Sequence, residues 1–194
     1  TSHYVGLDPN TLNHPNYQRQ VEFYKKHQTF FEEEKYVDMF CCPAEDFTDY
    51  DLYNDYFDTI FTSPPYFDVE KYSDEDTQSY KRYKTIDSWN ENFLHETLRL
   101  IIPTLKKDGI LAVNIADVYH ESVKGYVDIT NAMNDYIKSQ GLKYEGCIGM
   151  EMTKRFNSAG AGKAVSDYYS DNLKEKAVIT EDMAFGEPIW IWRK

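Results

Sequence analysis

One short turn carries the side chains best suited to chemistry. An apolar run of strand-forming residues ends at Phe61, and Ser63-Pro64-Pro65-Tyr66 follows almost at once. The two prolines fix φ and cannot continue a β-ladder, so they force the chain out of the sheet at the carboxyl end of the strand. In open α/β sheets, ligands bind at that end. The turn is therefore either a plain strand-terminating loop or a site that presents two hydrogen-bond acceptors, the Ser63 hydroxyl and the Pro64 carbonyl, beside the ring of Tyr66.

Acidic residues follow two other predicted strands. Asp8 ends an apolar strand that begins at Tyr4, and Glu45 and Asp46 follow the strand that stops at Pro43. An aspartate in front of a proline commonly starts a turn or caps a helix. In dinucleotide-binding folds, an acid at a strand end accepts hydrogen bonds from ribose hydroxyls. The residue types leave both roles open for Asp8.

The elements that must position these residues alternate along the chain. A strand, a helix and a second strand are followed by a short crossover into the strand that leads to Ser63, which is the rhythm of a parallel sheet. We therefore expect an α/β fold that forms a single domain over residues 1–194. The other predicted elements are strands over 4–8, 36–42, 110–116, 142–152 and 187–194, and helices from residue 14, over 87–102 and over 127–137.

The composition fits one folded domain. The chain has 194 residues, of which 41% are hydrophobic and 16% aromatic, enough to bury a core. No apolar run approaches the roughly 20 residues that cross a bilayer, and no signal peptide is recognisable. Cys41, Cys42 and Cys147 are odd in number and lack metal-ligand spacing, so we expect reduced thiols, no metal site and a cytoplasmic location.

The charge balance argues against a chain that binds duplex DNA on its own. With 21 basic and 33 acidic residues the net charge is −12, whereas proteins that hold a duplex alone usually carry a basic surface that neutralises phosphates. If the substrate is duplex DNA, either a small basic cluster suffices or the DNA is held by something outside the chain; otherwise the substrate is not duplex DNA. Solvated surface is the favoured interpretation of both basic clusters. These are Lys81, Arg82 and Lys84, and Lys154, Arg155 and Lys163.

Thr62-Ser63-Pro64-Pro65-Tyr66 resembles the catalytic motif of the S-adenosylmethionine-dependent DNA amino-methyltransferases, which modify cytosine N4 or adenine N6. The segment from Leu105 through Gly109 into the next strand is similar to a scaffold segment of class I methyltransferases. This resemblance implies a Rossmann-like class I fold, with a mostly parallel sheet and an antiparallel C-terminal strand. It also implies S-adenosylmethionine as the cofactor and a flipped DNA base as the substrate. The catalytic residues it implies are Ser63, Pro64, Pro65 and Tyr66, and the cofactor-binding residues are Asp8, Glu45, Asp46 and Thr62.

Within this resemblance, Asp8 would hold the ribose of the cofactor. Glu45 and Asp46 compete for the place near the adenine, although Pro43 stands where many relatives carry an acid. Asn114 and Asp117 are placed to reach the site from the end of the 110–116 strand, and turn formation explains Asp117 equally well. The polar loop 68–85 is expected to be a lid over the target base, with a merely solvated acidic loop as the alternative.

The resemblance also implies direct methyl transfer without a covalent intermediate. Ser63 Oγ and the Pro64 carbonyl would accept both N–H bonds of the target amine and aim its lone pair at the sulfonium methyl. Tyr66 would stack on the flipped base and offset an unstacking cost of a few kcal/mol. Serine at position 63 favours cytosine N4, because adenine enzymes more often carry Asp or Asn there. Cytosine C5 methylation would need a nucleophilic cysteine after a proline at this turn. It is rejected, because in Cys42-Pro43 the cysteine precedes the proline and the pair lies on another strand.

One part of the family pattern is not found. Relatives begin with a strand that runs into a Gly-rich turn close to the cofactor, and nothing before Tyr4 supplies it. We therefore expect the first strand to be missing, with the sheet completed by a preceding segment or by a partner such as a second copy. No separate target-recognition domain is recognisable. The alternatives are a noncatalytic or partner-dependent interaction protein of methyltransferase shape and, less favoured, a methyltransferase of RNA or protein amides.

Overall fold

The computed structural model describes residues 3–27, 35–121, 124–151 and 186–194. Its strands are β1 (His3–Leu7), β2 (Tyr36–Phe40), β3 (Phe57–Thr62), β4 (Leu105–Asn114), β5 (Val118–His120), β6 (Gly125–Val127), β7 (Lys143–Glu151) and β8 (Gly186–Arg193). Its helices are α1 (His14–His27), α2 (Ser79–Arg82), α3 (Ile86–Trp89), α4 (Glu96–Ile101) and α5 (Thr130–Ser139), with a π-helical segment at Asn90–His95 and 3-10 turns at Ala44–Asp46, Asp49–Tyr53 and Ile102–Thr104.

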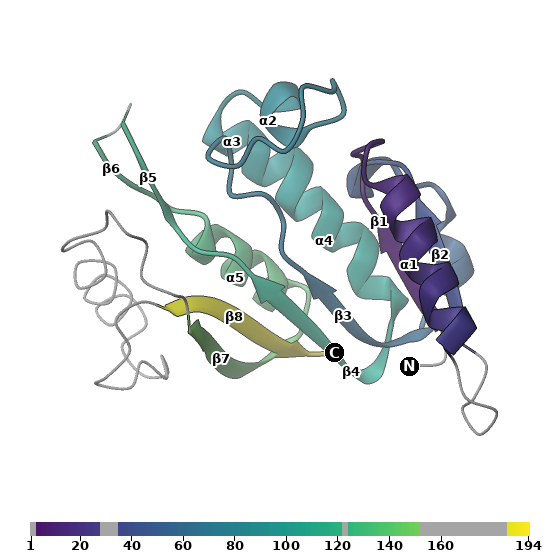
Figure 1. The fold of residues 1–194 in the computed structure, drawn as a ribbon. Coiled ribbons are helices and arrows are strands. Elements are labelled where there is room, and N and C mark those ends of the chain that lie inside the picture. The colour runs from purple at the N-terminus through teal and green to yellow at the C-terminus, as the bar shows by residue number, and fades with distance from the viewer. Residues whose placement is uncertain (1–2, 28–34, 122–123, 152–185) are drawn as a thin grey trace.

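The main sheet has the strand order β3-β4-β8-β7 (Figure 1). β3 and β4 are parallel, whereas β8 is antiparallel to both β4 and β7. Trp190 and Trp192 of β8 are both buried, because alternate side chains of a central strand point to the same face of the sheet. The predicted α/β fold, with an antiparallel C-terminal strand inserted beside its predecessor, is confirmed.

Helices pack on the main sheet and bury its apolar side chains. α4 and α5 run behind the sheet in the view of Figure 1. Trp89 and Leu98 from the helical stretch 86–104, and Met133 from α5, are at most 1% exposed and join Val113 of β4 in one apolar core. Within the described ranges, no helix is long and apolar enough to cross a membrane.

Several boundaries differ from those predicted. The helix predicted over 87–102 starts at Ile86 and is capped by Thr85, whose hydroxyl accepts a hydrogen bond from the Ser88 amide at 3.2 Å. A helix predicted to include Val127 begins only at Thr130, because Val127 belongs to β6, which pairs with β5.

The strand predicted from Ile110 begins five residues earlier, at Leu105. Its ladder with β3 is irregular near the start, and Asp108 lies there in the left-handed region with φ of 64°. Gly109 is required inside this strand, because a Cβ atom there would lie 2.8 Å from the Lys106 carbonyl oxygen. Residues 106–109, which precede the predicted strand, are therefore a bulged part of β4.

β1 and β2 form a separate parallel pair. This pair meets the main sheet at one end, where His3 Nδ1 and the Tyr56 hydroxyl are 2.8 Å apart. At the other end, Leu7 of β1 and Thr62 of β3 line a common cavity. Among the described residues, neither β1 nor β3 pairs with any strand on the side that faces this cavity.

Candidate active site

The Ser-Pro-Pro-Tyr turn, residues 63–66, leaves β3 at its carboxyl end as predicted. Pro64 is buried and Ser63 is exposed. Phe67 adopts φ of 53° and donates its amide to the Pro65 carbonyl at 3.0 Å. Its ring is buried at 6% exposure and makes an edge contact with Trp89, with ring centroids 6.2 Å apart. Phe67 thus anchors the turn while the Ser63 hydroxyl stays accessible.

Ser63 is held beside the end of β4. Thr62 pairs with Val113 in the parallel register, which places Ser63 next to Asn114. The Ser63 hydroxyl donates to Asn114 Oδ1 at 3.3 Å, and Asn114 Nδ2 donates to the Pro188 carbonyl at 3.0 Å. Asn114 therefore contacts the turn, as its place at the strand end predicted.

Tyr66 is held from two directions. Its amide donates to Glu70 Oε2 at 3.1 Å, and its hydroxyl donates to Glu187 Oε2 at 3.4 Å. Partial burial raises the pKa of the Tyr66 phenol well above its usual range, and the negative charges of the nearby Glu187 and Glu70 carboxylates add to this effect. The ring is therefore neutral throughout the physiological pH range.

A cavity of about 1220 Å³ joins the turn to the β1–β2 pair. Asp8 and Glu45 line it from the β1–β2 side, and Thr62, Ser63, Pro64 and Pro65 line it from the turn. The structure thus brings together most of the residues that the sequence predicted for the site. Asp46 and Tyr66 are not among the lining residues.

Asp8 directly follows the last residue of β1 and takes part in a network of hydrogen bonds. Its carboxylate accepts from the Asn10 amide at 2.9 Å, from Asn13 Nδ2 at 3.0 Å and from the Tyr17 hydroxyl. Partial burial acts to raise the pKa of Asp8, but the hydrogen bonds from Tyr17, Asn13 and Asn10 outweigh it and lower that pKa. Asp8 is therefore an ionised acceptor, and the turn role and the ligand role both fit its position.

Glu45 and Asp46 share one cation, Arg82 of α2. Arg82 Nη1 lies 2.8 Å from Glu45 Oε1, and its two terminal nitrogens bind both Asp46 oxygens at 2.8 and 2.9 Å. The Tyr83 hydroxyl donates to Glu45 Oε1 at 3.1 Å. Burial raises the pKa of Glu45 in spite of Arg82. Glu45 Oε2 is buried and has no hydrogen-bond partner in the described part of the chain, so Glu45 is better placed than Asp46 to accept a ligand.

The loop 68–85 is more ordered than a plain polar loop. It contains α2, and Arg82 ties it to the 3-10 turn at Ala44–Asp46. Near the middle of the loop, the Glu75 carboxylate accepts hydrogen bonds from the Thr11 amide and hydroxyl. His120 Nε2 lies 3.2 Å from Asp68 Oδ2, which connects the loop to the β5–β6 hairpin. Its function as a lid stays a prediction.

Asp117 does not reach the turn. It is 7% exposed, and its Oδ1 accepts the backbone amides of Ile129 and Thr130 at 2.8 Å each. Its Oδ2 accepts the Thr130 hydroxyl at 3.1 Å. These are the unsatisfied donors at the start of α5, so Asp117 serves helix capping, which is neither the reach to the site nor the turn formation that the sequence suggested.

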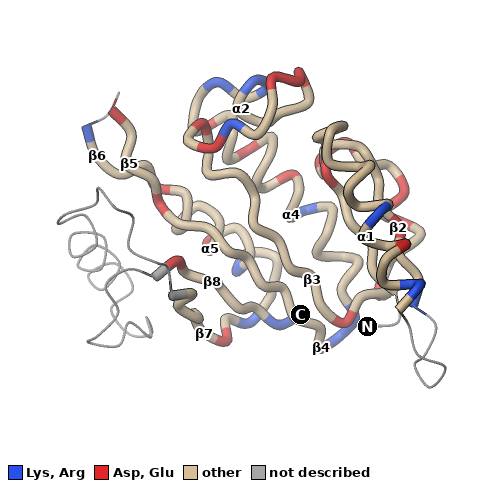
Figure 2. Tube along the Cα trace, viewed as in Figure 1, with Lys and Arg blue, Asp and Glu red and all other residues tan. Residues whose placement is uncertain are grey.

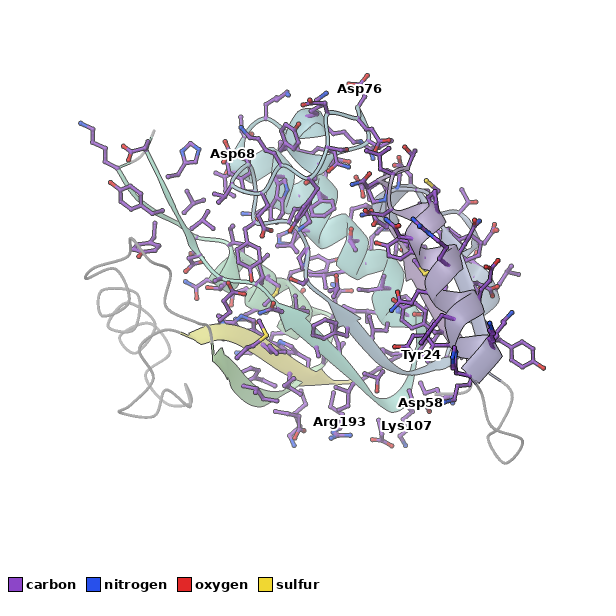
Figure 3. The ribbon with its side chains drawn as sticks, viewed as in Figure 1. Tyr24, Asp58, Asp68, Asp76, Lys107 and Arg193 are labelled. Carbon is purple, nitrogen blue, oxygen red and sulfur yellow. The ribbon has the colours of Figure 1, made fainter. Side chains whose placement is uncertain are left out.

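The basic residues lie mostly away from the turn. Figure 2 shows lysine and arginine at the ends of β4 and β8 near the C-terminus, and Figure 3 labels Lys107 and Arg193 there, at the opposite end of the sheet from Asp68. In the cluster at Lys81–Lys84, Arg82 is occupied by carboxylates and Lys81 lies 3.6 Å from Asp76. The cluster at residues 154–163 lies outside the described residues.

Two contacts of the site escaped the sequence reasoning. Glu187 is the second residue of the last strand and binds Tyr66 across 121 positions, so the local sequence pattern carries no signal for it. Arg82 appeared only as part of a basic cluster, and the ion pairs with two upstream acids require the folded chain. No group of three or more potential metal ligands occurs in the described ranges.

An α/β sheet with an antiparallel last strand, and a Ser-Pro-Pro-Tyr turn beside a cavity lined by acids, define a protein of the methyltransferase class. The family model described as DNA methylase, of the N6/N4 type, matches residues 57–184, more than half of the chain. The chain therefore belongs to this family of S-adenosylmethionine-dependent DNA amino-methyltransferases.

The chain is also similar to individual proteins. Type II methyltransferase M.MjaVI of Methanocaldococcus jannaschii is 36% identical over 107 residues, which cover 54% of this chain and 50% of the relative. The chain thus spans about half the length of that relative. An O-methyltransferase from a Brevibacillus brevis multienzyme, solved with S-adenosyl-L-homocysteine, has a similar fold at 11% identity and a TM-score of 0.50 over 98% of this chain and 58% of its own. A protein from Thermus thermophilus, provisionally assigned as a DNA modification methylase, gives a TM-score of 0.47 at 14% identity over 99% of this chain and 54% of its own.

Proposed function

We propose that this chain is a single catalytic domain that transfers a methyl group from S-adenosylmethionine to the exocyclic amino group of a DNA base. The observation that carries the proposal is the common cavity, in which the Ser63 hydroxyl opens to the same space as the Asp8 and Glu45 carboxyl groups. A methyl acceptor held by the turn and a cofactor held by the acids would then be adjacent. Such proximity is a large part of catalysis for a bimolecular transfer.

The residues of the cavity suit the cofactor. A carboxylate offers about four acceptor positions, and three are used on Asp8, so one remains for a ribose hydroxyl. The unpartnered Glu45 Oε2 is an acceptor suited to the amino group of adenine. Thr62 adds a hydroxyl on the turn side. When bound, S-adenosylmethionine would supply an electrophilic methyl group: its C–S bond would break as the C–N bond forms, S-adenosylhomocysteine would leave, and the methylated amine would lose one proton to solvent.

The turn acts on the amine of the base. Ser63 Oγ and the Pro64 carbonyl each accept one N–H of the target amine, which draws its lone pair out of conjugation and stabilises the positive charge that develops on nitrogen. Tyr66 stacks on the base, and this contact offsets the cost of unstacking it from a duplex. Because Ser63 replaces the acid or amide that is more frequent in adenine enzymes, cytosine N4 is the favoured target.

The test uses the complete gene product, expressed in a host without DNA methylation of its own. Mass spectrometry of the host nucleosides is expected to show N4-methylcytosine, and calorimetry is expected to show binding of S-adenosylmethionine. Ser63→Ala and Tyr66→Ala each lower methylation by about tenfold or more, whereas the control Ser139→Ala, on the exposed surface of α5, leaves it unchanged. Absence of both methylated base and cofactor binding would favour a noncatalytic interaction protein.

We also infer that activity depends on an additional β-strand between β1 and β3. In the described part of the chain, both strands have an open edge toward the cavity, and open edges are paired or covered in stable sheets. Tyr4 and Phe61 are 53% and 62% exposed beside these edges, which is unusual for large side chains in strands next to a core. The occupant we propose is a strand of the same gene product from outside residues 1–194.

The additional strand is tested through Phe61. A lysine there would lie beside the proposed strand in the complete gene product, but would be surrounded by solvent in residues 1–194 alone. Phe61→Lys is therefore expected to destabilise the complete product more than the isolated residues 1–194. Ile148→Lys, at a 56% exposed position on β7, is the control. Equal Phe61→Lys effects in the two proteins exclude the strand, and dimerisation of residues 1–194 by light scattering indicates a second copy instead.

A further inference from the structure

Asn114 is a buried polar residue at the end of the apolar strand β4. Its side chain is 4% exposed and lies outside the cavity lining. A buried amide requires partners for its oxygen and its nitrogen, and here the oxygen faces Ser63 while the nitrogen faces the Pro188 carbonyl. A backbone carbonyl accepts but never donates hydrogen bonds. Pro188 therefore fixes the Asn114 amide with its oxygen toward Ser63.

This orientation decides the direction of the Ser63 hydroxyl. A serine hydroxyl has one proton to donate and two lone pairs to accept with. Because Asn114 Oδ1 only accepts, the Ser63 proton points toward β4 and the lone pairs of Oγ are left for the exposed side of the turn. A hydroxyl free to rotate would instead donate to any nearby acceptor in some of its orientations, and those orientations are unproductive for holding an N–H.

We propose that Asn114 is a positioning residue that takes the Ser63 proton and so directs the Oγ lone pairs at the amine of the target base. This inference rests on the proposed function. The distance of 3.3 Å between Ser63 Oγ and Asn114 Oδ1 is long for two oxygens, and such contacts tighten when a substrate binds. Asn114 is a neutral amide, so it orients the serine without removing its proton.

β8 takes part in this arrangement through its backbone. Asn114 pairs with Ile189 in the antiparallel ladder, which brings the preceding Pro188 carbonyl within 3.0 Å of Nδ2. The backbone of β8 thus fixes the orientation of the Asn114 amide, which in turn orients the Ser63 hydroxyl.

The test is a double-mutant cycle between Asn114 and Ser63 in the complete gene product, measured as methyl transfer to DNA with saturating cofactor. Asn114→Leu, which is similar in size but has no polar atoms, is expected to lower kcat about tenfold. In the Ser63→Ala background the same change is expected to have no further effect on kcat, because its action passes through the hydroxyl. The KM for S-adenosylmethionine stays unchanged in Asn114→Leu.

The controls separate positioning from folding. Asn114→Asp keeps an acceptor oxygen for Ser63 but loses the donor to the Pro188 carbonyl, so it is expected to recover only part of the kcat that Asn114→Leu loses. Asn90→Leu, which also replaces a buried asparagine, leaves kcat unchanged. Should Asn114→Leu not fold, as judged by its thermal transition, Asn114→Ala takes its place in the cycle.

The possible results are distinct from those of the proposed function. A wild-type protein without methyl transfer overturns the function itself, and the positioning role with it. An active wild type in which Ser63→Ala is impaired, but Asn114→Leu is fully active, overturns only the positioning role. The same conclusion follows if the losses of Asn114→Leu and Ser63→Ala multiply in the double variant, since a purely structural effect would persist without the hydroxyl.

Discussion

The Tyr66 hydroxyl donates a hydrogen bond to the Glu187 carboxylate at 3.4 Å, across 121 positions of the chain. With the bond from the Tyr66 amide to Glu70, it ties the Ser-Pro-Pro-Tyr turn to the last strand and to the loop 68–85. The backbone of the turn is therefore held before any base arrives, and the ring keeps one weak contact through its hydroxyl. Preorganisation of this kind reduces the entropy that a substrate must give up on binding.

The ring of Tyr66, rather than its hydroxyl, is expected to support methyl transfer. Tyr66→Phe removes a long and weak hydrogen bond but keeps the stacking surface, so kcat stays within about threefold of wild type. Because the pKa of Tyr66 lies well above its usual range, the hydroxyl does not titrate near neutral pH. The pH–rate profiles of wild type and Tyr66→Phe should therefore coincide. An added ionisation in the wild type alone would show that the phenol takes part in chemistry.

Arg82→Ala is expected to destabilise the protein in a pH-dependent way. The Glu45 side chain is 3% exposed, and removal of its cation leaves a buried carboxylate that costs about 1–3 kcal/mol. The folded-state pKa of Glu45 is already raised by burial, so the folded protein binds this proton more tightly than the unfolded chain and loses stability as pH rises through that pKa. Arg82→Ala raises the pKa further, so the loss of stability should be larger at about pH 8 than at about pH 5 in thermal unfolding.

Two variants control this experiment. Arg99→Ala breaks an exposed ion pair with Glu96, which should cost no more than about 0.5 kcal/mol. Glu45→Gln in the Arg82→Ala background removes the uncompensated charge, so it should recover stability at the higher pH and abolish the pH dependence. A loss in Arg82→Ala that is equal at both pH values would mean that Glu45 is already neutral when Arg82 is present.

The sequence predicted those parts of the site that depend on local chemistry. Two prolines after Phe61 force a turn wherever the strand lies, and Asp8 follows its strand directly. Asn114 was placed correctly because a polar residue that ends an apolar strand has few other roles. Asp117 shows the limit of such reasoning, since its partners at Ile129 and Thr130 are known only once the hairpin is formed.

The order of most helices and strands was predictable from the sequence, but the residues at which they begin and end were not. The apolar pattern around Val127 suits a helix or a strand, and pairing with Val118 in the hairpin decided the outcome. β4 extends back to Leu105 because that residue pairs with Phe57 across the bulge. Contacts between distant segments, such as Glu187 with Tyr66, follow from strand order and register, which the residue pattern alone does not fix.

Asp117→Ala is expected to be among the most destabilising single changes outside the apolar core. It leaves the buried amides of Ile129 and Thr130 without acceptors, at a cost of about 2 kcal/mol or more. Chemical denaturation would measure the effect. Asp128→Ala, which removes an exposed acceptor for the Asn131 amide, is the matched control and should cost less than about 1 kcal/mol. Similar losses in both variants would contradict a capping role specific to Asp117.

Tyr17→Phe is expected to lower the free energy of unfolding at neutral pH and to move acid unfolding to higher pH. The folded-state pKa of Asp8 is lowered by its hydrogen bonds, above all that from Tyr17, so Asp8 contributes stability that is present above its unfolded pKa near 3.8 and is lost as pH falls through the folded value. Removing the Tyr17 hydroxyl raises the folded pKa and removes about 0.5–1.5 kcal/mol of this contribution.

The measurement for Tyr17→Phe is the free energy of unfolding from neutral pH down to about pH 2. The matched control is Tyr24→Phe, on the same helix and 65% exposed, which should follow the wild-type curve. Tyr17→Phe should lie below the wild type at neutral pH and converge with it at the acid end, where Asp8 is protonated in both folded and unfolded states. A constant offset at every pH would instead assign the loss to packing of the Tyr17 ring, because such packing does not depend on the charge of Asp8.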